Sequence, residues 1–323
     1  MRAIVAQRAG GPEVLEIAEV SAPEPAAGEL LVRTAFTGIN FIEIYQRSGV
    51  YSVDFPFTPG AEASGVVEAL GEGVTGFSVG DRVTTAQASA TYAELFTVPA
   101  MLAVKVPGGI ALDVAGAVPL QGLTAHYLAT SVATLSPSDT VLVHAGAGGV
   151  GLLLTQLLVA RGVRVLTTVS TPEKAELSRA AGASEVFDYD SFLEGVKAAT
   201  NGEGVAAVFD GVGRSTFDGS LASLRTRGTL ALFGGASGQV PVFDLQRLNA
   251  GGSLSITRPS LGHFLRTPEE RAWRYSELFD AIADGSLDVS IGGRFALADA
   301  AAAHTALASR GTTGKLVLEV TPS

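Results

Sequence analysis

The spacing of hydrophobic and polar positions changes twice along the chain, which divides it into three zones. Residues 1 to about 120 hold short strand-like runs that are broken by glycine, proline and aspartate, such as Leu30–Arg33 and Gly65–Glu68. Closely spaced short runs of this kind are typical of β-strands in a compact unit. The first zone is therefore predicted to be rich in β-structure.

Between about Thr124 and Thr257 the pattern predicts strands that alternate with helices. The helical segments include 172–181 and 215–224. Alternation of this kind implies a parallel sheet whose crossover connections are right-handed. The expected strands are Thr140–His144, Arg164–Val169, Glu185–Phe187, Val205–Phe209, Thr229–Phe233 and Ser253–Ile256.

The third zone begins with a helical pattern over 268–284. A strand-like run over 293–296, a helical run over 298–308 and a second strand over 315–320 follow it. The fold class predicted from the three zones is α/β, with a β-rich part and a parallel-sheet part.

A glycine-rich turn joins the first strand of the middle zone to its first helix. Val141–Val143 runs into the turn, and the apolar stretch Leu152–Ala160 follows. In the GxGxxG fingerprint one glycine permits a tight turn, the next lets the backbone approach a pyrophosphate, and the third lets helix and strand pack closely. Free N–H groups at the helix N-terminus then favour phosphate. This context predicts a dinucleotide site rather than a glycine loop that binds nothing, and its residues are Gly146, Gly148, Gly149, Val150 and Gly151.

The end of the second strand predicts which dinucleotide is bound. An NAD enzyme usually places Asp or Glu about 20 residues after the turn, where it bonds the ribose 2′-hydroxyl. This chain has Ser170 and Thr171 there, and Lys174 follows within the next helix. Because a lysine suits a phosphate group, NADPH is the expected cofactor. The alternative for Lys174 is an ordinary solvated surface lysine.

Composition limits the location and the partners. The chain has 323 residues, of which 47% are hydrophobic, and its formal net charge is −10. That length suggests two domains, and an acidic surface disfavours nucleic acid and anionic membranes as partners. We find no signal-peptide core and no apolar run near ~20 residues, so the expected location is the cytoplasm. The absence of cysteine excludes disulfides and thiolate nucleophiles.

Motifs along nearly the whole chain resemble the zinc-free quinone oxidoreductase, or zeta-crystallin-like, branch of the medium-chain dehydrogenase/reductase superfamily. One small departure is Val159, three residues after Gln156, where the family usually has a basic residue or serine. The resemblance implies a GroES-like catalytic domain made of residues 1–122 and 264–323, with a Rossmann domain of residues 123–263 inserted in it. The motifs are Gly10–Leu15, Gly38–Glu43, Arg47–Tyr51, Gly71–Phe77, Gly80–Val83, the glycine turn and Thr257–Leu261.

The resemblance also implies that the protein holds no metal. Zinc-dependent relatives have a cysteine near the segment Gly38–Glu43 and a histidine in a Gly-His-Glu motif, whereas the matching positions here hold Asn40 and Gly60-Ala61-Glu62. A zinc site needs convergent Cys, His or carboxylate ligands. No two of the four histidines, His126, His144, His263 and His304, have ligand spacing. An acceptor that takes hydride without a Lewis acid is intrinsically electrophilic, like a quinone or an activated enone or enal.

Further site residues follow from the resemblance and from their places beside its motifs and strand ends. Asn40 is expected to contact the nicotinamide end and the substrate. Tyr45 and Tyr51 flank the substrate segment, where they either bond the acceptor oxygen or form an apolar pocket wall. Glu43 is either a solvated barrel residue or a proton relay, and the proton donor stays unidentified. The other expected cofactor contacts are Thr124, Tyr189, Phe233, Gly234, Thr257, Arg258 and Arg310, with Phe233 equally well placed to be a core aromatic.

These observations predict an NADPH-dependent, zinc-independent quinone reductase that holds cofactor and acceptor in a cleft between its domains. One alternative is an enoyl or alkenal double-bond reductase of the same fold, and another is a structural or RNA-binding zeta-crystallin-like protein. Whether electrons leave singly or as hydride stays open. The segment Gly251–Thr257 reads as a strand at a sheet edge, which invites pairing across a two-fold axis. We therefore expect a homodimer.

Overall fold

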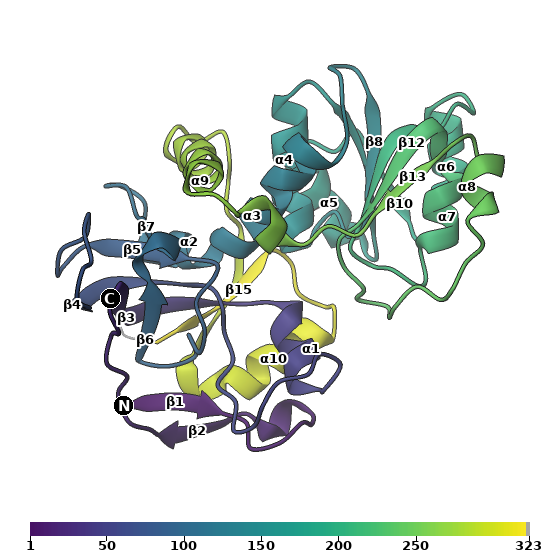
Figure 1. Ribbon diagram of the computed structural model, residues 1–323. Helices are drawn as coiled ribbons and strands as arrows, with labels where there is room; N and C mark the ends of the chain where they lie inside the picture. The colour runs from purple at the N-terminus through teal and green to yellow at the C-terminus, as the bar shows by residue number, and fades with distance from the viewer. Residues whose placement is uncertain (321–323) are drawn as a thin grey trace. The chain divides into compact units, whose positions relative to one another are not determined.

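The computed structural model describes residues 1–320, and this part of the chain forms two compact units (Figure 1). Unit 1 consists of Met1–Gln121, Arg271–Ala283 and the residues from Val289 onward. Unit 2 consists of Gly122–Glu270 and Asp284–Asp288. Residues 264–270, which the resemblance assigns to the catalytic domain, are grouped with unit 2. No helix in the described residues is long and apolar enough to cross a membrane.

Unit 2 is built on a six-stranded sheet with the order β10-β9-β8-β11-β12-β13. Every neighbouring pair in it is parallel. This is the doubly wound order in which the chain starts at a central strand and reverses direction beside it. The strands are β8 (Thr140–Val143), β9 (Arg164–Val169), β10 (Glu185–Asp188), β11 (Val205–Asp210), β12 (Leu224–Leu232) and β13 (Ser255–Thr257).

Helices cover both faces of this sheet, as Figure 1 shows within unit 2. Helices α6 and α7 pack on fully buried strand residues such as Leu142, Val208 and Leu230, while α4 and α5 contact β9 on the other face. Parallel strands buried on both faces are expected to read as continuous apolar runs, which is what made them visible in the sequence. The helices are α3 (Pro119–Tyr127), α4 (Gly149–Ala160), α5 (Pro172–Ala180), α6 (Phe192–Ala199), α7 (Phe217–Ala222) and α8 (Gln246–Ala250), with short helical turns at Leu128–Val132 and Leu261–Phe264.

The prediction differs from the structure most at β12. This strand begins at Leu224, five residues before the predicted start at Thr229, so the preceding helix α7 ends early. The first residues of the strand include Arg225, Thr226 and Arg227, which are partly or fully exposed, and its register against β11 shifts between Val205 and Ala207. A polar, irregular strand start gives no apolar run to recognise.

Unit 1 is built on an antiparallel sheet with the order β14-β15-β3-β4-β5-β7, in which β6 also pairs with β3 and only β14–β15 is parallel. A separate hairpin pairs β1 with β2. The strands are β1 (Arg2–Val5), β2 (Glu16–Glu19), β3 (Glu29–Ile39), β4 (Ala63–Leu70), β5 (Arg82–Thr85), β6 (Leu95–Pro99), β7 (Val104–Lys105), β14 (Ile291–Ala296) and β15 (Lys315–Glu319). The helices are α1 (Phe41–Arg47), α2 (Leu112–Ala117), α9 (Pro268–Ala283) and α10 (Ala300–Ala308), with short turns at Pro12–Val14, Ala100–Leu102 and Leu297–Asp299.

Strand register in unit 1 brings three distant chain segments to one place. Leu316 of β15 lies opposite Ile39 of β3, and Ala63 of β4 lies opposite Thr37 on the other side of β3. Since Lys315 begins β15, Asn40 directly follows β3 and Glu62 directly precedes β4, the register places these three residues side by side.

Candidate functional site

The glycine turn of unit 2 leaves the start of α4 open. Strand β8 ends at Val143, and the Gly146 N–H donates to the Thr168 carbonyl of β9 at 2.9 Å. Gly148 caps α4 and offers no side chain to its first N–H groups. Uncapped N–H groups at a helix N-terminus bind anions, and the helix dipole adds a partial positive charge. This turn can therefore receive a pyrophosphate.

Close packing explains the glycines of this turn. A Cβ on Gly151 would lie 2.2 Å from the Ala145 carbonyl oxygen, and one on Gly146 would lie 2.6 Å from Thr167 Cβ. The left-handed residue of the turn is Ala145, with φ at 56°, rather than a glycine. The third glycine thus allows the close helix approach as predicted, whereas the first is required for space and not for backbone freedom.

The predicted 2′-phosphate residues lie together at the carboxyl end of β9. Ser170 directly follows the strand and is exposed. Thr171 caps α5, its hydroxyl accepting the Lys174 N–H at 3.3 Å, and the Lys174 side chain is half-buried. The same strand end is bonded to the glycine turn through the Thr168 carbonyl, so Ser170, Thr171 and the start of α5 lie beside the pyrophosphate-binding turn.

A buried polar network behind the turn was not found from the sequence. His144 lies between Thr168 and Ser220, with its ring nitrogens 2.8 and 3.0 Å from their hydroxyl oxygens. Ser220 in turn donates to Asp210 at 2.8 Å. Burial lowers the pKa of His144 to about 4, against the opposing effect of Asp210. Tyr189, an expected cofactor residue, stacks against the His144 ring at 6.1 Å between ring centroids. The sequence signal for this network was a polar residue at the end of an apolar strand, which is where His144 and Asp210 lie.

Two further groups of expected cofactor residues lie in unit 2. Thr124 is hydrogen-bonded to Tyr127, whose pKa burial raises to about 12 while Arg258 and that bond oppose the rise. Tyr127 also stacks on Phe264, with ring centroids 4.4 Å apart. Phe233 and Gly234 directly follow β12, and Thr257 ends β13. The half-buried Phe233 ring packs over Gly211, where a Cβ would lie 2.9 Å from it.

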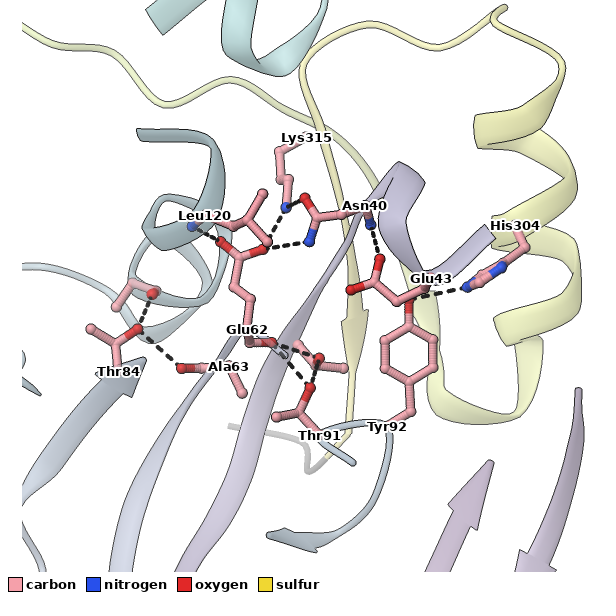
Figure 2. A network of polar contacts seen from close by, with 12 residues as sticks. Asn40, Glu43, Glu62, Ala63, Thr84, Thr91, Tyr92, Leu120, His304 and Lys315 are labelled. Carbon is pink, nitrogen blue, oxygen red and sulfur yellow. Dashed lines mark hydrogen bonds and ion pairs between the residues drawn. The ribbon is translucent and has the colours of Figure 1, made fainter. Parts of the chain in front are cut away.

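Asn40 belongs to a buried polar cluster in unit 1, which Figure 2 shows. Its side-chain oxygen accepts from Lys315 Nζ at 2.6 Å, and its side-chain nitrogen donates to Glu62 Oε2 at 3.0 Å. Lys315 and Glu62 form an ion pair at 2.5 Å. All three side chains are buried, with the Lys315 and Glu62 side chains only 2% and 0% exposed.

Glu43 stands beside this cluster and is fully buried, so the solvated alternative for it is wrong. It lies in the first turn of α1, where its Oε2 accepts the Asn40 backbone N–H at 2.7 Å. Burial raises the pKa of Glu43 to about 8, although Lys315 and the Asn40 N–H oppose the rise. The carboxyl group is therefore largely protonated at neutral pH. Tyr92 and His304 form a second buried pair here, with a hydroxyl-to-nitrogen distance of 3.1 Å (Figure 2).

The two tyrosines expected at the substrate contact each other. The rings of Tyr45 and Tyr51 meet edge to face at 5.4 Å between centroids, and the Tyr51 N–H donates to the Tyr45 carbonyl. Tyr45 is half-buried and Tyr51 is 39% exposed. Arg310 also belongs to unit 1, where it is exposed and has a positive φ of 58° just after α10.

The position of the zinc site in zinc-dependent relatives does not fit a metal here. The oxygen atoms of Asn40 and Glu62 that could face a cation are both bonded to the Lys315 ammonium group. Among the described residues, no group of three or more His, Cys, Asp or Glu side chains is placed to hold a metal ion. The chain's own lysine thus supplies the positive charge at this position.

Comparison with known proteins places the chain in a family. The family described as alcohol dehydrogenase GroES-like domain matches residues 26–139, and that described as zinc-binding dehydrogenase matches residues 149–279. A quinone oxidoreductase of Pseudomonas aeruginosa is 44% identical over 96% of both chains. A 2-haloacrylate reductase of a Burkholderia species is 38% identical over 98% of both chains.

Solved structures agree with these relatives. A mycobacterial protein in complex with NADPH is 54% identical, with a TM-score of 0.97 over 99% of this chain and 100% of that one. The quinone oxidoreductase of Escherichia coli in complex with NADPH is 39% identical, with a TM-score of 0.97 over the same shares. A GroES-like part with a doubly wound dinucleotide-binding part defines a medium-chain dehydrogenase/reductase. Within that superfamily the chain belongs to the zinc-free quinone oxidoreductase branch, which confirms the family predicted from the sequence.

Proposed function

We propose that this protein is an NADPH-dependent, zinc-independent reductase of quinones. The observation that carries the proposal is the end of β9, where Ser170, Thr171 and Lys174 follow the strand that is bonded to the open glycine turn. Hydroxyl residues and a lysine stand there in place of the Asp or Glu that is usual in NAD enzymes. A carboxylate at the strand end itself would repel the 2′-phosphate of NADPH. The nearest carboxylate, Glu173, lies in the first turn of α5 and is hydrogen-bonded to the Thr171 side chain. The quinone oxidoreductases among the relatives, and the NADPH complexes of two similar proteins, support the same activity.

In this function the residues of unit 2 bind and orient the cofactor. When bound, NADPH supplies hydride from its nicotinamide ring. The N–H groups at the start of α4 hold the pyrophosphate, and Lys174 holds the 2′-phosphate. Thr124, Tyr189, Phe233, Gly234, Thr257 and Arg258 are the proposed further contacts, with Arg310 from unit 1.

In unit 1, Asn40, Tyr45 and Tyr51 are the proposed contacts of the nicotinamide end and the acceptor. Their amide and hydroxyl groups donate hydrogen bonds, which stabilise a developing phenolate oxygen less strongly than a metal ion does. The acceptor must therefore be electrophilic by itself, as a quinone is. Tyr51 is exposed and touches Tyr45, so a proton from solvent can reach that pair of hydroxyls.

Steady-state kinetics with 1,4-naphthoquinone and 1,4-benzoquinone test the proposal. We expect oxidation of NADPH that depends on the quinone, with kcat/KM for NADPH at least about tenfold above that for NADH, because a phosphate contact contributes about 1.5–3 kcal/mol. A preference for NADH, or no turnover with any quinone, contradicts it.

A second candidate is the reduction of an activated carbon–carbon double bond. The 38% identical 2-haloacrylate reductase is the observation that favours it. An α,β-unsaturated acid and a quinone both contain an electron-poor double bond that accepts hydride, so one pocket can suit both. Parallel kcat/KM measurements with 2-chloroacrylate, an alkenal and a naphthoquinone at saturating NADPH separate the two candidates by which acceptor is preferred.

We also propose a homodimer, formed through the edge of the unit 2 sheet. Strand β13 is the last strand of that sheet, and an uncovered edge carries unpaired backbone groups. Two large apolar side chains before α8, Val242 and Leu245, are 103% and 69% exposed. Light scattering at micromolar concentration should give twice the chain mass, and a monomer there contradicts the proposal. The cytoplasmic location stays a prediction from the sequence.

A further inference from the structure

The ion pair between Lys315 and Glu62 has no evident role in holding unit 1 together. Lys315 is the first residue of β15, and Glu62 lies just before β4, so the pair joins two strands that β3 already connects through backbone bonds. Burial of two charges costs as much free energy as their attraction returns, and apolar pairs of the same volume are often at least as stable. The role of the pair is therefore sought in what it does to the residue between its charges.

That residue is Asn40, and the pair determines which way its amide faces. An ammonium group can only donate and a carboxylate can only accept. Lys315 must therefore meet the amide oxygen of Asn40, and Glu62 must meet the amide nitrogen, as the distances of 2.6 and 3.0 Å show. A half-turn of the amide would set its N–H groups against the ammonium and its oxygen against the carboxylate. Only one orientation is then populated.

Other atoms hold the parts of this arrangement in place. The second carboxylate oxygen of Glu62 accepts the Leu120 N–H at 2.6 Å, so Glu62 cannot rotate freely. Glu43 fixes the Asn40 backbone N–H. Gly38 leaves room for both charged side chains, because a Cβ there would lie 2.0 Å from Glu62 Oε2 and 2.7 Å from Lys315 Cε. Each contact restrains Asn40 or one of its two charged partners.

We propose that Lys315 and Glu62 are positioning residues, which lock the Asn40 amide so that its second N–H is presented in one direction to the nicotinamide end or the acceptor oxygen. An asparagine nitrogen has two hydrogens, and Glu62 takes only one of them. The proposal rests on the proposed function, in which Asn40 contacts the cofactor or the acceptor. Neither charged residue needs to touch the reacting atoms.

The test compares Asn40→Ala, the double variant Glu62→Gln/Lys315→Met, and the triple variant that combines them. The double variant removes both charges together, because one charge left alone and buried would itself destabilise unit 1. Gly38→Ala is a second probe that pushes on both charged side chains without changing either. The readouts are the Kd of NADPH, kcat/KM for naphthoquinone, thermal unfolding, and the NMR signal of the Asn40 side-chain amide, assigned by its loss in Asn40→Ala.

We expect the double variant and Gly38→Ala to lower kcat/KM by about tenfold or more, with the Kd of NADPH within about twofold of wild type. The triple variant should be no slower than Asn40→Ala, because residues that act through one another are not additive. The Asn40 amide signal should show slow hydrogen exchange in the wild type and fast exchange in the double variant. The proposal is overturned if the loss of kcat/KM in the triple variant equals the product of the losses in Asn40→Ala and the double variant. Full activity in the double variant, or an unchanged Asn40 amide signal, would also overturn it.

A control variant separates a loss of positioning from a loss of stability. Val98→Ala makes a cavity at a fully buried position of β6, which lies opposite Leu30 of β3 in an apolar cluster, so it lowers stability without changing kcat/KM per folded molecule. An equal loss of kcat/KM in that variant would assign the effect to stability and overturn the positioning role. Failure of the proposed function would appear instead as wild-type protein that reduces no quinone with NADPH, while the amide signal still decides the orientation.

Discussion

Replacement of Gly151 by alanine is the sharpest test of the nucleotide turn. The new Cβ would lie 2.2 Å from the Ala145 carbonyl oxygen and 3.0 Å from the Ala145 and Gly146 carbonyl carbons. To reach ordinary van der Waals contact at 3.4 Å, the turn and α4 must separate by about 1.2 Å, since 3.4 − 2.2 = 1.2. The obstacle is backbone, so no side-chain rotation relieves it.

Two effects follow from that displacement, one on stability and one on cofactor binding. Forcing a methyl group into a packed site costs about 1–3 kcal/mol of unfolding free energy, here in unit 2. The same movement takes the turn and the α4 N–H groups out of register with a pyrophosphate. Loss of a charge-assisted hydrogen bond there costs about 1.5–3 kcal/mol, which is an increase of about 10- to 100-fold in the Kd of NADPH.

Calorimetric titration with NADPH and denaturant unfolding measure the two effects, and the chain offers two matched controls. Gly148→Ala places a Cβ 3.2 Å from the same Ala145 oxygen, so we expect a smaller loss of stability than for Gly151→Ala. Gly262→Ala, in the same unit, has no atom within 4 Å of the new Cβ and should change neither quantity. Wild-type affinity and stability in Gly151→Ala would refute the assigned role of the turn.

Three further outcomes are expected. Lys174→Ala should raise the Kd of NADPH about tenfold or more, leave that of NADH unchanged, and flatten the salt dependence of NADPH binding; equal losses for both cofactors would show that Lys174 binds a group common to them. Because the pKa of Glu43 rises from 4.5 to about 8 on folding, the folded state holds more protons between these values, so stability should fall as pH rises through that window, by up to about 1.4 kcal/mol per pH unit. Glu43→Gln should remove this slope in denaturant unfolding at pH 5 to 9, and a slope that persists would assign it elsewhere. Activity should survive exhaustive chelation, since Lys315 takes the place of a metal between Asn40 and Glu62; turnover that only added zinc restores would contradict this.

The sequence predicted the parts of the fold that repeat a local pattern. The inner parallel strands β8, β9 and β11 were visible as buried, mostly apolar runs, and the turn after Val143 was visible as a cluster of glycines. The predicted helix over 172–181 matches α5 within one residue. The start of β12 was missed because Arg225 to Arg227 are polar and exposed. The local sequence pattern does not reveal the start of such a strand, because its pairing with the neighbouring strand β11 determines where it begins.

The residues of the candidate site likewise fall into those that the sequence predicted and those that it did not. The residues of the glycine turn and of the β9 end follow one another in the chain, so their proximity could be read from spacing. Asn40 was identified only through resemblance to a family. The partners of Asn40 were not found, since Glu62 and Lys315 are separated by 253 positions and meet only through the register of β15, β3 and β4. The available signal was a lysine directly before three apolar residues at the start of the strand Lys315–Glu319.

The late position of Lys315 has a consequence for the order in which a growing chain matures. All of unit 2 precedes β15 in sequence, so ribosomal synthesis completes the nucleotide-binding part before the lysine emerges. Until then Glu62 faces Asn40 without its counter-charge, and the register that aligns them is not set. A nascent chain stalled before residue 315 is therefore expected to retain NADPH yet lack quinone turnover, whereas release of the remaining segment should switch activity on without any metal being loaded. Stalled and released complexes, compared by cofactor retention and turnover, would show whether the two capacities appear in that order.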